Sequence, residues 1–220
     1  MEDLKKIETQ DPDEKSALDF LTLNKSEWKI HEQTEEYKIS YSNIPMKNPL
    51  TKNNEEHLCT CLEVVVKALP EKVFKFMTDF NIRKSVEPLY KDGKLISETK
   101  GNPEIYIAYL YLKMGFMMSD RDFVVQKKMW SNYNDKKDHY LIQVSSIDHK
   151  DYPEKSKPVR GIFFNRVAYI KPGEKEGETH LTLCNCIDMK FPKFGTKAIK
   201  PQAEGMKKWL NQLKDMINKI

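Results

Sequence analysis

Three charged residues stand together in the middle of the chain, between two runs of apolar residues. Asp120, Arg121 and Asp122 lie between the apolar run 105–112 and the strand-like run 123–130. A buried arginine in such a place requires a carboxylate or several other acceptors, because an unpaired buried charge is very costly. The alternative is a hairpin turn with both aspartates in water. The motif alone leaves both interpretations open.

The four cysteines form two C-x-C pairs, Cys59 with Cys61 and Cys184 with Cys186. Each pair lies in a strand-like run, so both members project from the same face of a sheet. Neighbouring strands would allow a four-thiolate zinc site or disulfides. Structural zinc sites, however, mostly use C-x₂₋₄-C turns that wrap the ion. We therefore favour small buried thiols, and we expect no metal and no cofactor.

Signatures of catalysis are absent from the sequence. There is no G-x-S-x-G motif, no glycine-rich phosphate loop and no H-E-x-x-H motif, and the five histidines are scattered. We therefore predict a protein that is not an enzyme. An enzyme with a site scattered over the sequence stays open as an alternative, with Glu87, Tyr109 and Asp122 as its candidate acid and base groups.

The periodicity of apolar residues predicts mostly strands, followed by one long helix. Strands are expected at 28–32, 37–41, 57–68, 94–99, 105–112, 123–130, 139–146, 160–170 and 179–188. Helices are expected at 16–23, 70–79, 82–89 and 199–220, and loops at 43–54 and 148–158. The last helix carries one apolar stripe, flanked by Trp209 and Met216 and formed by Ile199, Ala203, Met206, Leu210, Leu213, Ile217 and Ile220. This pattern predicts an α+β fold.

The bulk properties indicate an ordinary globular chain. Its 220 residues are most simply one domain. The 37 basic and 33 acidic residues are interspersed and leave a net charge of +4, which gives no reason to expect nucleic acid as a partner. The first residues contain no apolar signal-peptide core, and no apolar run approaches ~18 residues. We expect a cytoplasmic protein.

In their order along the chain, four features resemble the START family of lipid-transfer domains. They are a strand that leads into a helix at 68–79, the R-D-F element at 121–123, the V-R-G element at 159–161 and the long amphipathic last helix. The resemblance covers residues 15–220 and leaves 1–14 as an N-terminal extension. Segment 113–123 is most similar to the phosphatidylcholine-transfer branch.

This resemblance implies a helix-grip fold, in which a curved antiparallel β-sheet wraps around a long C-terminal α-helix and encloses a hydrophobic cavity. It implies a lipid-binding and lipid-transfer protein that encloses one lipid, a phospholipid, and exchanges it at membranes. We expect a monomer that contacts the membrane surface transiently. A helix-grip cyclase or hydrolase and a non-transferring lipid sensor or adaptor are the alternatives.

The resemblance also implies which residues bind the ligand. Arg83 falls on the arginine that contacts the lipid phosphate in that branch, with Glu87 as its acid one helical turn later. By spacing alone the two would form a surface pair. The choline cage would fall on Leu110, Phe123 and Phe164, and a shift of one residue would bring Tyr109 or Tyr111 into the first of these positions. A cage of two Phe and one Leu would hold trimethylammonium more weakly than one Trp and two Tyr.

Three further residues complete the expected set. Arg121 is expected to be mainly structural, paired with a carboxylate in the R-D-F turn. Met206 and Trp209 are expected on the surface of the last helix that meets the ligand or the membrane. That helix, together with the loop at 148–158, would open as a lid.

Overall fold

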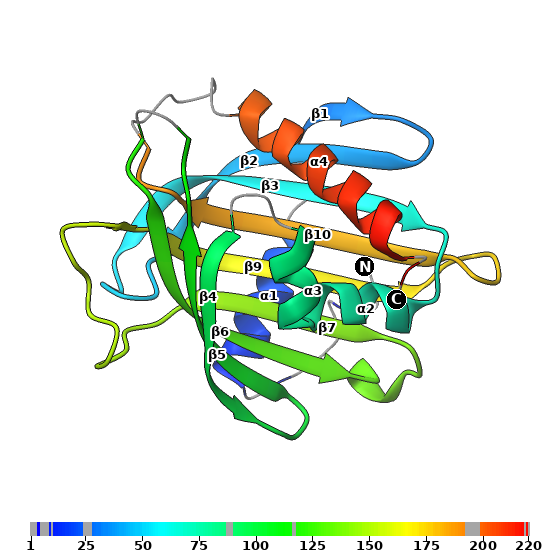
Figure 1. Cartoon of the computed structure of the whole chain (residues 1–220). Coiled ribbons are helices and arrows are strands. Elements are labelled where there is room, and N and C mark those ends of the chain that lie inside the picture. The colour runs from blue at the N-terminus through cyan, green and yellow to red at the C-terminus, as the bar shows by residue number, and fades with distance from the viewer. Residues whose placement is uncertain are drawn as a thin grey trace.

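A ten-stranded sheet organises the chain, with helices on both of its faces (Figure 1). This computed structural model describes residues 4, 9, 11–23, 28–86, 90–115, 118–191, 199–217 and 219. The helices are α1 (Pro12–Thr22), α2 (Pro70–Thr78), α3 (Phe80–Val86) and α4 (Ile199–Ile217), with a 3₁₀ turn η3 (Tyr133–Asp135). The strands are β1 (Lys29–Gln33), β2 (Tyr37–Lys47), β3 (Asn54–Val66), β4 (Tyr90–Thr99), β5 (Glu104–Leu112), β6 (Arg121–Ser131), β7 (Tyr140–Ser146), β8 (Val159–Arg160), β9 (Ile162–Pro172) and β10 (Thr179–Asp188).

The strand order is β1-β2-β3-β10-β9-β7-β6-β5-β4, and neighbours in this order are antiparallel. The short strand β8 lies off this path and pairs in parallel with the start of β6. The last strand, β10, lies between β3 and β9, so the C-terminal part of the sheet joins its N-terminal part. These features confirm the predicted α+β class and helix-grip arrangement.

The two faces of the sheet carry different helices (Figure 1). We call the face covered by α2, α3 and α4 the inner face, and the face covered by α1 the outer face. Each face has its own cluster of buried apolar side chains. The inner cluster joins side chains of α2 and α4 to those of β3, β6, β7, β9 and β10. The outer cluster joins α1 to the reverse side of the same strands.

The apolar stripe of the last helix is buried as predicted. Ile199, Ala203, Met206, Trp209, Leu210, Leu213 and Ile217 of α4 are all buried, whereas Ile220 lies outside the described residues. The helix contacts β3 and α2 through this stripe. A stripe repeating every three or four residues forms a single side of a helix, which fits one sheet face.

Short-range signals set where the other helices begin. The Asp11 carboxylate accepts hydrogen bonds from the backbone N–H groups of Asp13 and Glu14, at 2.8 and 3.3 Å, and caps α1. Proline occupies the first turn of both α1 and α2, where it costs no hydrogen bond. Asp79 ends α2 and its side chain caps α3, which therefore begins at Phe80 rather than at Ile82 as predicted.

One segment predicted as a loop is a strand. Residues 43–47 continue β2 and pair with β3, and Pro45 lies opposite Glu56. The pairing of β1 with β2 reaches only Tyr41, so the far edge of β2 has no partner strand beyond that point among the described residues. Proline is tolerated there because no strand on that side requires its missing N–H. The proline and asparagine residues that predicted a loop are a local signal, whereas pairing with β3 makes residues 43–47 part of a strand.

Candidate functional site

Two basic side chains, those of Lys127 and Arg166, lie in one row that runs across the strands of the inner face. Lys127 of β6 lies opposite Val144 of β7, which lies opposite Arg166 of β9, which in turn lies opposite Asn185 of β10. Directly opposed residues share a face of the sheet, and Val144 belongs to the inner cluster. Lys127 and Arg166 therefore both point toward the helices.

Lys127 has a strongly shifted pKa. Its amino group donates a hydrogen bond to the carbonyl of Met77, at the end of α2, over 3.2 Å. Burial, followed by the positive charges of Arg83 and Arg166, lowers the pKa of Lys127 to about 7, although Asp79 acts in the opposite direction. The residue keeps some exposed surface, but enough protein surrounds its amino group to disfavour the charge. Burial and the two nearby guanidinium groups therefore favour the neutral amine of Lys127.

Arg83 of α3 lies among aromatic rings on the same side of the sheet. Its guanidinium carbon is 5.3 Å from the ring centroid of Phe76 and 6.0 Å from that of Trp209. These two rings contact each other edge to face at 5.8 Å. The predicted residues Arg83 and Trp209 are therefore brought together, from α3 and α4, although 126 positions separate them in the sequence.

Buried polar atoms that have no hydrogen-bond partner among the described residues gather on this face. They include the Tyr90 hydroxyl, the indole N–H of Trp209 and the side-chain carbonyl of Asn185. Tyr90 contacts Phe80 of α3 edge to face, and burial raises the pKa of its hydroxyl although the charge of Arg83 lowers it. Leaving such an atom unsatisfied costs about 1–3 kcal/mol, so native proteins rarely leave several in one place.

Gly93 makes room for the Tyr90 side chain. Tyr90 and Gly93 of β4 lie opposite Leu112 and Leu110 of β5, on the inner face. A β-carbon at position 93 would lie 2.1 Å from the Tyr90 hydroxyl oxygen. Only glycine at this position lets the tyrosine hydroxyl lie where it does.

The inner face is packed unevenly. Residues of α4, β3 and β10 such as Leu62, Leu210 and Leu213 are fully buried. Apolar side chains toward α3 and β5 are only partly buried against the same cluster; they are Phe80, Ile82, Val86, Tyr106, Leu110 and Leu112. Leu110, Phe123 and Met206, all predicted as ligand-binding, lie in or against this inner cluster.

Two pockets are open elsewhere in the molecule. One, of about 120 Å³, lies on the outer face near Cys61 and Cys184. Another, of about 360 Å³, is lined by Tyr111, Met118, Ser119, Asp120, Lys157 and Pro158. Neither lies beneath α4, where side chains fill the space between helix and sheet.

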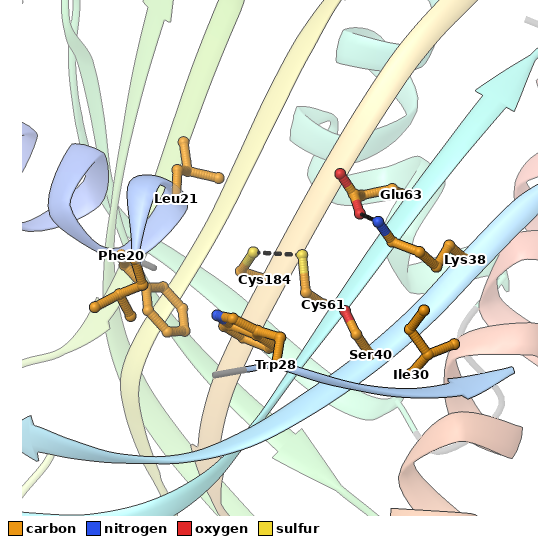
Figure 2. A pocket seen from close by; sticks show the side chains of 10 residues that line it. Phe20, Leu21, Trp28, Ile30, Lys38, Ser40, Cys61, Glu63 and Cys184 are labelled. Atoms are coloured by element: carbon orange, nitrogen blue, oxygen red, sulfur yellow. Dashed lines mark hydrogen bonds and ion pairs between the residues drawn. The ribbon is translucent and has the colours of Figure 1, made fainter. Parts of the chain in front are cut away.

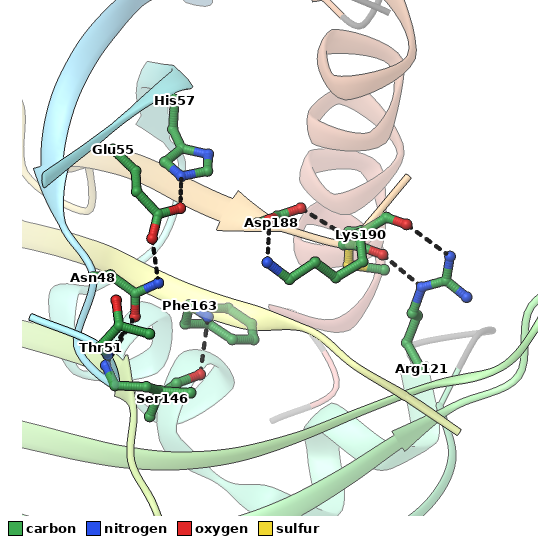
Figure 3. Close-up of polar contacts among 11 residues, drawn as sticks. Asn48, Thr51, Glu55, His57, Arg121, Ser146, Phe163, Asp188 and Lys190 are labelled. Carbon is green, nitrogen blue, oxygen red and sulfur yellow. Dashed lines mark hydrogen bonds and ion pairs between the residues drawn. The ribbon is translucent and has the colours of Figure 1, made fainter. Parts of the chain in front are cut away.

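The two charged residues of the R-D-F element, Arg121 and Asp122, bind different partners. Arg121 was expected to pair with a carboxylate, but its guanidinium instead donates to the backbone carbonyls of Met189 and Lys190 (Figure 3). It also donates to the carbonyl of Ser119. Its guanidinium also lies 5.0 Å from the ring centroid of Phe191. Arg121 thus ties the start of β6 to the segment that follows β10. The expected partner was wrong because three convergent carbonyls satisfy the charge equally well.

The carboxylate of Asp122 binds a different arginine. Arg160 of β8 forms a two-pronged ion pair with it, with N···O distances of 2.9 and 3.0 Å, and both side chains are buried. Tyr109 also hydrogen-bonds to Asp122, and its ring stacks on Tyr152 in the loop before β8. Burial, followed by the Asp122 charge, raises the pKa of Tyr109 to about 12. Of the three groups considered for acid–base catalysis, two are therefore engaged in a structural network.

Three other predicted ligand residues do not join the inner site. Tyr109 and Tyr111 alternate with Leu110 along β5, so they point to the opposite face, and the Tyr111 hydroxyl donates to Asp120 over 2.6 Å. Phe164 belongs to the outer cluster, where its ring centroid is 3.9 Å from that of His57. A register irregularity in the pairing of β9 with β10 beside Phe164 leaves Phe163 on the inner face and Phe164 on the outer one. Glu87 lies outside the described residues.

Sequence reasoning missed Lys127, Arg166 and Tyr90. Lys127 stands beside Lys128 in a strand, and alternation puts one lysine of such a pair on each face. Lys128 points outward and pairs with Asp11 and Asp13 of the α1 start, at 3.1 and 2.9 Å. The alternation of side chains along the strand could have indicated that one of the two lysines, Lys127, points inward. No such pattern in the sequence identifies Tyr90.

The two C-x-C pairs meet in the structure. All four thiols are free and buried on the outer face. Within the described part of the chain, no group of three or more His, Cys, Asp or Glu side chains is placed to hold a metal ion. None of the described helices is long and apolar enough to cross a membrane.

Comparison with known proteins agrees with this architecture. Among solved structures, human StAR-related lipid transfer protein 5 matches with a TM-score of 0.71 and 16% identity over 90% of each chain. Human STARD10 matches with a TM-score of 0.72 and 16% identity over 96% of this chain and 83% of the other. The lipid transfer and protein localization domain of human StarD13 matches with a TM-score of 0.64 and 18% identity over 86% of each chain. At these identities the likeness shows a shared fold.

A search of curated protein sequences found no match. The START domain family model, in contrast, matches residues 12–190, which is most of the chain. The helix-grip fold with α4 across the inner face agrees with that match. This chain belongs to the START domain family.

Proposed function

We propose that this domain binds one phospholipid on its inner face, with the phosphate at Arg83, and exchanges it at membrane surfaces. The observation that carries the proposal is the pair of unsatisfied buried groups beside Arg83, the Tyr90 hydroxyl and the Trp209 indole N–H. Both can donate hydrogen bonds, and a phosphate provides several acceptor oxygens. The START-family membership supports a lipid as the ligand.

The charges of the inner face favour an anionic head group. Arg83 offers a planar set of donors that suits phosphate, and Lys127 offers an ammonium that a nearby anion would keep charged. Burial, followed by the charges of Arg83 and Arg166, lowers the pKa of Lys127, and a nearby anion would favour its charged form. A bound phosphate would supply such an anion.

The partly buried apolar residues of α3 and β5 would hold the acyl chains. Transfer of each methylene group from water gains roughly 0.8 kcal/mol, so two chains can provide most of the affinity. Side chains now fill the space under α4, so a lipid can enter only if α4 moves away from the sheet. The inner face would then exchange the contacts of α4 for those of the lipid.

The attachments of α4 suit such movement. Lys207 pairs with Glu32 at 3.0 Å and Lys214 pairs with Glu36 at 2.6 Å, which joins α4 to the β1–β2 hairpin. The Lys207–Glu32 pair is half-buried and the Lys214–Glu36 pair is more exposed, and ion pairs open to water in this way hold a helix weakly. Arg121 fixes the chain at Met189 and Lys190, before the segment that leads into α4. In this proposal α4 is the lid, because the described contacts of the loop at 148–158 are with Tyr109 and Arg160 instead.

Native mass spectrometry would test the binding. The purified chain would be incubated with vesicles of phosphatidylcholine, phosphatidic acid or a neutral diacylglycerol, then separated from them and weighed. We expect one phospholipid per chain and weak or no retention of diacylglycerol, which has no phosphate. Equal retention of diacylglycerol would contradict a phosphate site at Arg83, and absence of any adduct would contradict lipid binding.

A reversible tether would test the lid. The double variant Glu36→Cys with Lys214→Cys, made with the natural cysteines replaced by alanine, can join α4 to the hairpin when oxidised. The matched control is Lys38→Cys with Glu63→Cys, which links two residues that already face each other on β2 and β3. We expect oxidation to stop transfer between vesicles in the first variant alone. Unchanged transfer by a fully cross-linked α4 would contradict the lid.

A further inference from the structure

The four cysteines form a two-by-two grid on the outer face. Cys61 of β3 lies directly opposite Cys184 of β10, and Thr60 lies opposite Asn185. Continuing this antiparallel register places Cys59 opposite Cys186, and both are buried in the outer cluster. Each thiol therefore has one partner directly across the strand pair. This site does not involve the inner face and does not rest on the proposed function.

The first pair is close enough to bond. The two sulfur atoms of Cys61 and Cys184 are 2.7 Å apart, compared with ~2.05 Å in a disulfide. Directly opposed residues in antiparallel strands have Cα atoms ~4.5–5.5 Å apart, which lies within the range of disulfides. A bond between these two sulfurs thus requires side-chain rotation and little backbone movement.

This pair lines an opening on the outer face. Cys61 and Cys184 border the pocket of about 120 Å³ on the outer face, beside Phe20 and Trp28 (Figure 2). Cys61 keeps 7% of its surface exposed, whereas Cys59 and Cys186 keep none. The pocket exceeds the ~30 Å³ share of one water molecule several times, so it has room for a small peroxide.

We propose that Cys61 and Cys184 form an oxidisable dithiol site that takes a small peroxide. The Cys61 thiolate attacks one oxygen of hydrogen peroxide, the O–O bond breaks, and the released hydroxide takes up a proton to form water. Cys184 sulfur then attacks the Cys61 sulfenic acid, and its proton leaves with the departing hydroxide as a second water molecule. Two thiols are oxidised to one disulfide, and one peroxide is reduced to two waters.

The contacts of the pair assign the order of these steps. The Cys184 thiol donates its hydrogen bond to the Cys61 sulfur, which would stabilise a thiolate on Cys61. This hydrogen bond, followed by burial, raises the pKa of Cys184 well above its usual value. Cys184 therefore stays protonated and acts second.

The experiment is a disulfide map of the full chain. Reduced protein is treated with hydrogen peroxide, the remaining thiols are alkylated under denaturing conditions, and the digested peptides are identified by mass spectrometry. We expect one disulfide, between Cys61 and Cys184, with Cys59 and Cys186 alkylated. A disulfide joining Cys59 to Cys186, or four alkylated thiols after prolonged exposure at pH 9, would overturn the proposal.

Matched variants check the assignment. Cys59→Ala with Cys186→Ala removes the neighbouring pair and should form the disulfide at the wild-type rate. Cys184→Ala should leave Cys61 as a sulfenic acid, detectable with a dimedone-type probe. Circular dichroism verifies that each variant is folded. Loss of the disulfide in the folded first variant, or lack of probe labelling in the folded second, would contradict the proposed pair; the wild-type map decides the question if a variant does not fold.

Discussion

The two faces of the sheet differ in how their buried polar groups are paired. On the outer face and at the adjoining end of β6, charges are matched: Asp122 binds Arg160, and Lys128 binds Asp11 and Asp13. Asn165 on this side also donates to Ser16 at 3.3 Å. On the inner face the Tyr90 hydroxyl and the Trp209 indole N–H have no hydrogen-bond partner in the described part of the chain, and Lys127 has a lowered pKa.

Under the proposed function, this difference separates groups that stabilise the fold from groups that would bind the ligand. A buried polar group that is fully paired contributes to structure, and breaking its pair destabilises the protein. A buried group left without a partner costs free energy in the absence of a ligand. Substitutions on the two faces should therefore have opposite effects on stability and on lipid uptake.

The largest effect is expected for Asp122→Ala. This change leaves the buried Arg160 without its carboxylate and should lower the free energy of unfolding by about 3–5 kcal/mol. Guanidinium unfolding measures the loss. The double variant Asp122→Leu with Arg160→Met should recover part of it, and lipid uptake per folded molecule should stay at the wild-type level. A strong loss of uptake in the folded double variant would show that this network also serves the ligand.

The next largest effect is expected for Arg83→Ala. A hydrogen bond to a charged group contributes about 1.5–3 kcal/mol, so phospholipid affinity should fall roughly 10- to 100-fold. Titration with short-chain phospholipid, followed by tryptophan fluorescence, measures the affinity. The matched control is Lys84→Ala, which removes the adjacent charge on α3, where an exposed side chain pairs with Asp92 at 3.9 Å. Equal effects of the two substitutions would remove Arg83 from the site.

Lys127→Met should raise stability and remove a pH dependence. With a folded pKa of about 7 and an ordinary value of 10.5 when unfolded, the wild type binds fewer protons folded than unfolded between these values. Its stability should therefore rise with pH from about 7 to about 10.5. The variant should lack this rise and be more stable at pH 7 by roughly 1–4 kcal/mol, because a buried charge is replaced by an apolar side chain.

Lipid uptake by the wild type should show the reverse dependence on pH. A phosphate favours charged Lys127, so uptake should weaken as the pH rises above about 7; the other charged groups that act on Lys127 are Asp79, Arg83 and Arg166. Uptake that does not change between pH 6 and pH 9 in both proteins would place Lys127 away from the ligand.

The smallest effect is expected for Tyr90→Phe. Removing a hydroxyl that has no partner should leave stability unchanged or raise it by about 1 kcal/mol, and loss of one neutral hydrogen bond should weaken uptake about 2- to 10-fold. Gly93→Ala would sharpen the result, because its methyl group would collide with the Tyr90 hydroxyl and displace it. A destabilised Tyr90→Phe variant would show that the hydroxyl already has a structural partner.

The order of elements and the apolar stripe of the last helix were predictable from the sequence because both depend on local periodicity. Strand β10 has the predicted bounds, 179–188, and α4 begins at Ile199 as predicted. Arg83 and Trp209 were proposed from resemblance, and the structure brings them together. The partner of Arg121 and the sheet face of Phe164 were predicted less well. A backbone carbonyl partner and an irregularity in strand register cannot be read from residue types.

The sequence by itself determined the α+β class, the helix that lies across the sheet and the same-face arrangement of each C-x-C pair, because alternation and helical period act over a few residues. Only the tertiary structure decided that Lys127, Arg83 and Arg166 share one face, that Asp122 binds Arg160 and that Cys61 meets Cys184. Those contacts join strands and helices far apart in the chain. Strand order and register fix them, and neither is encoded in any short segment.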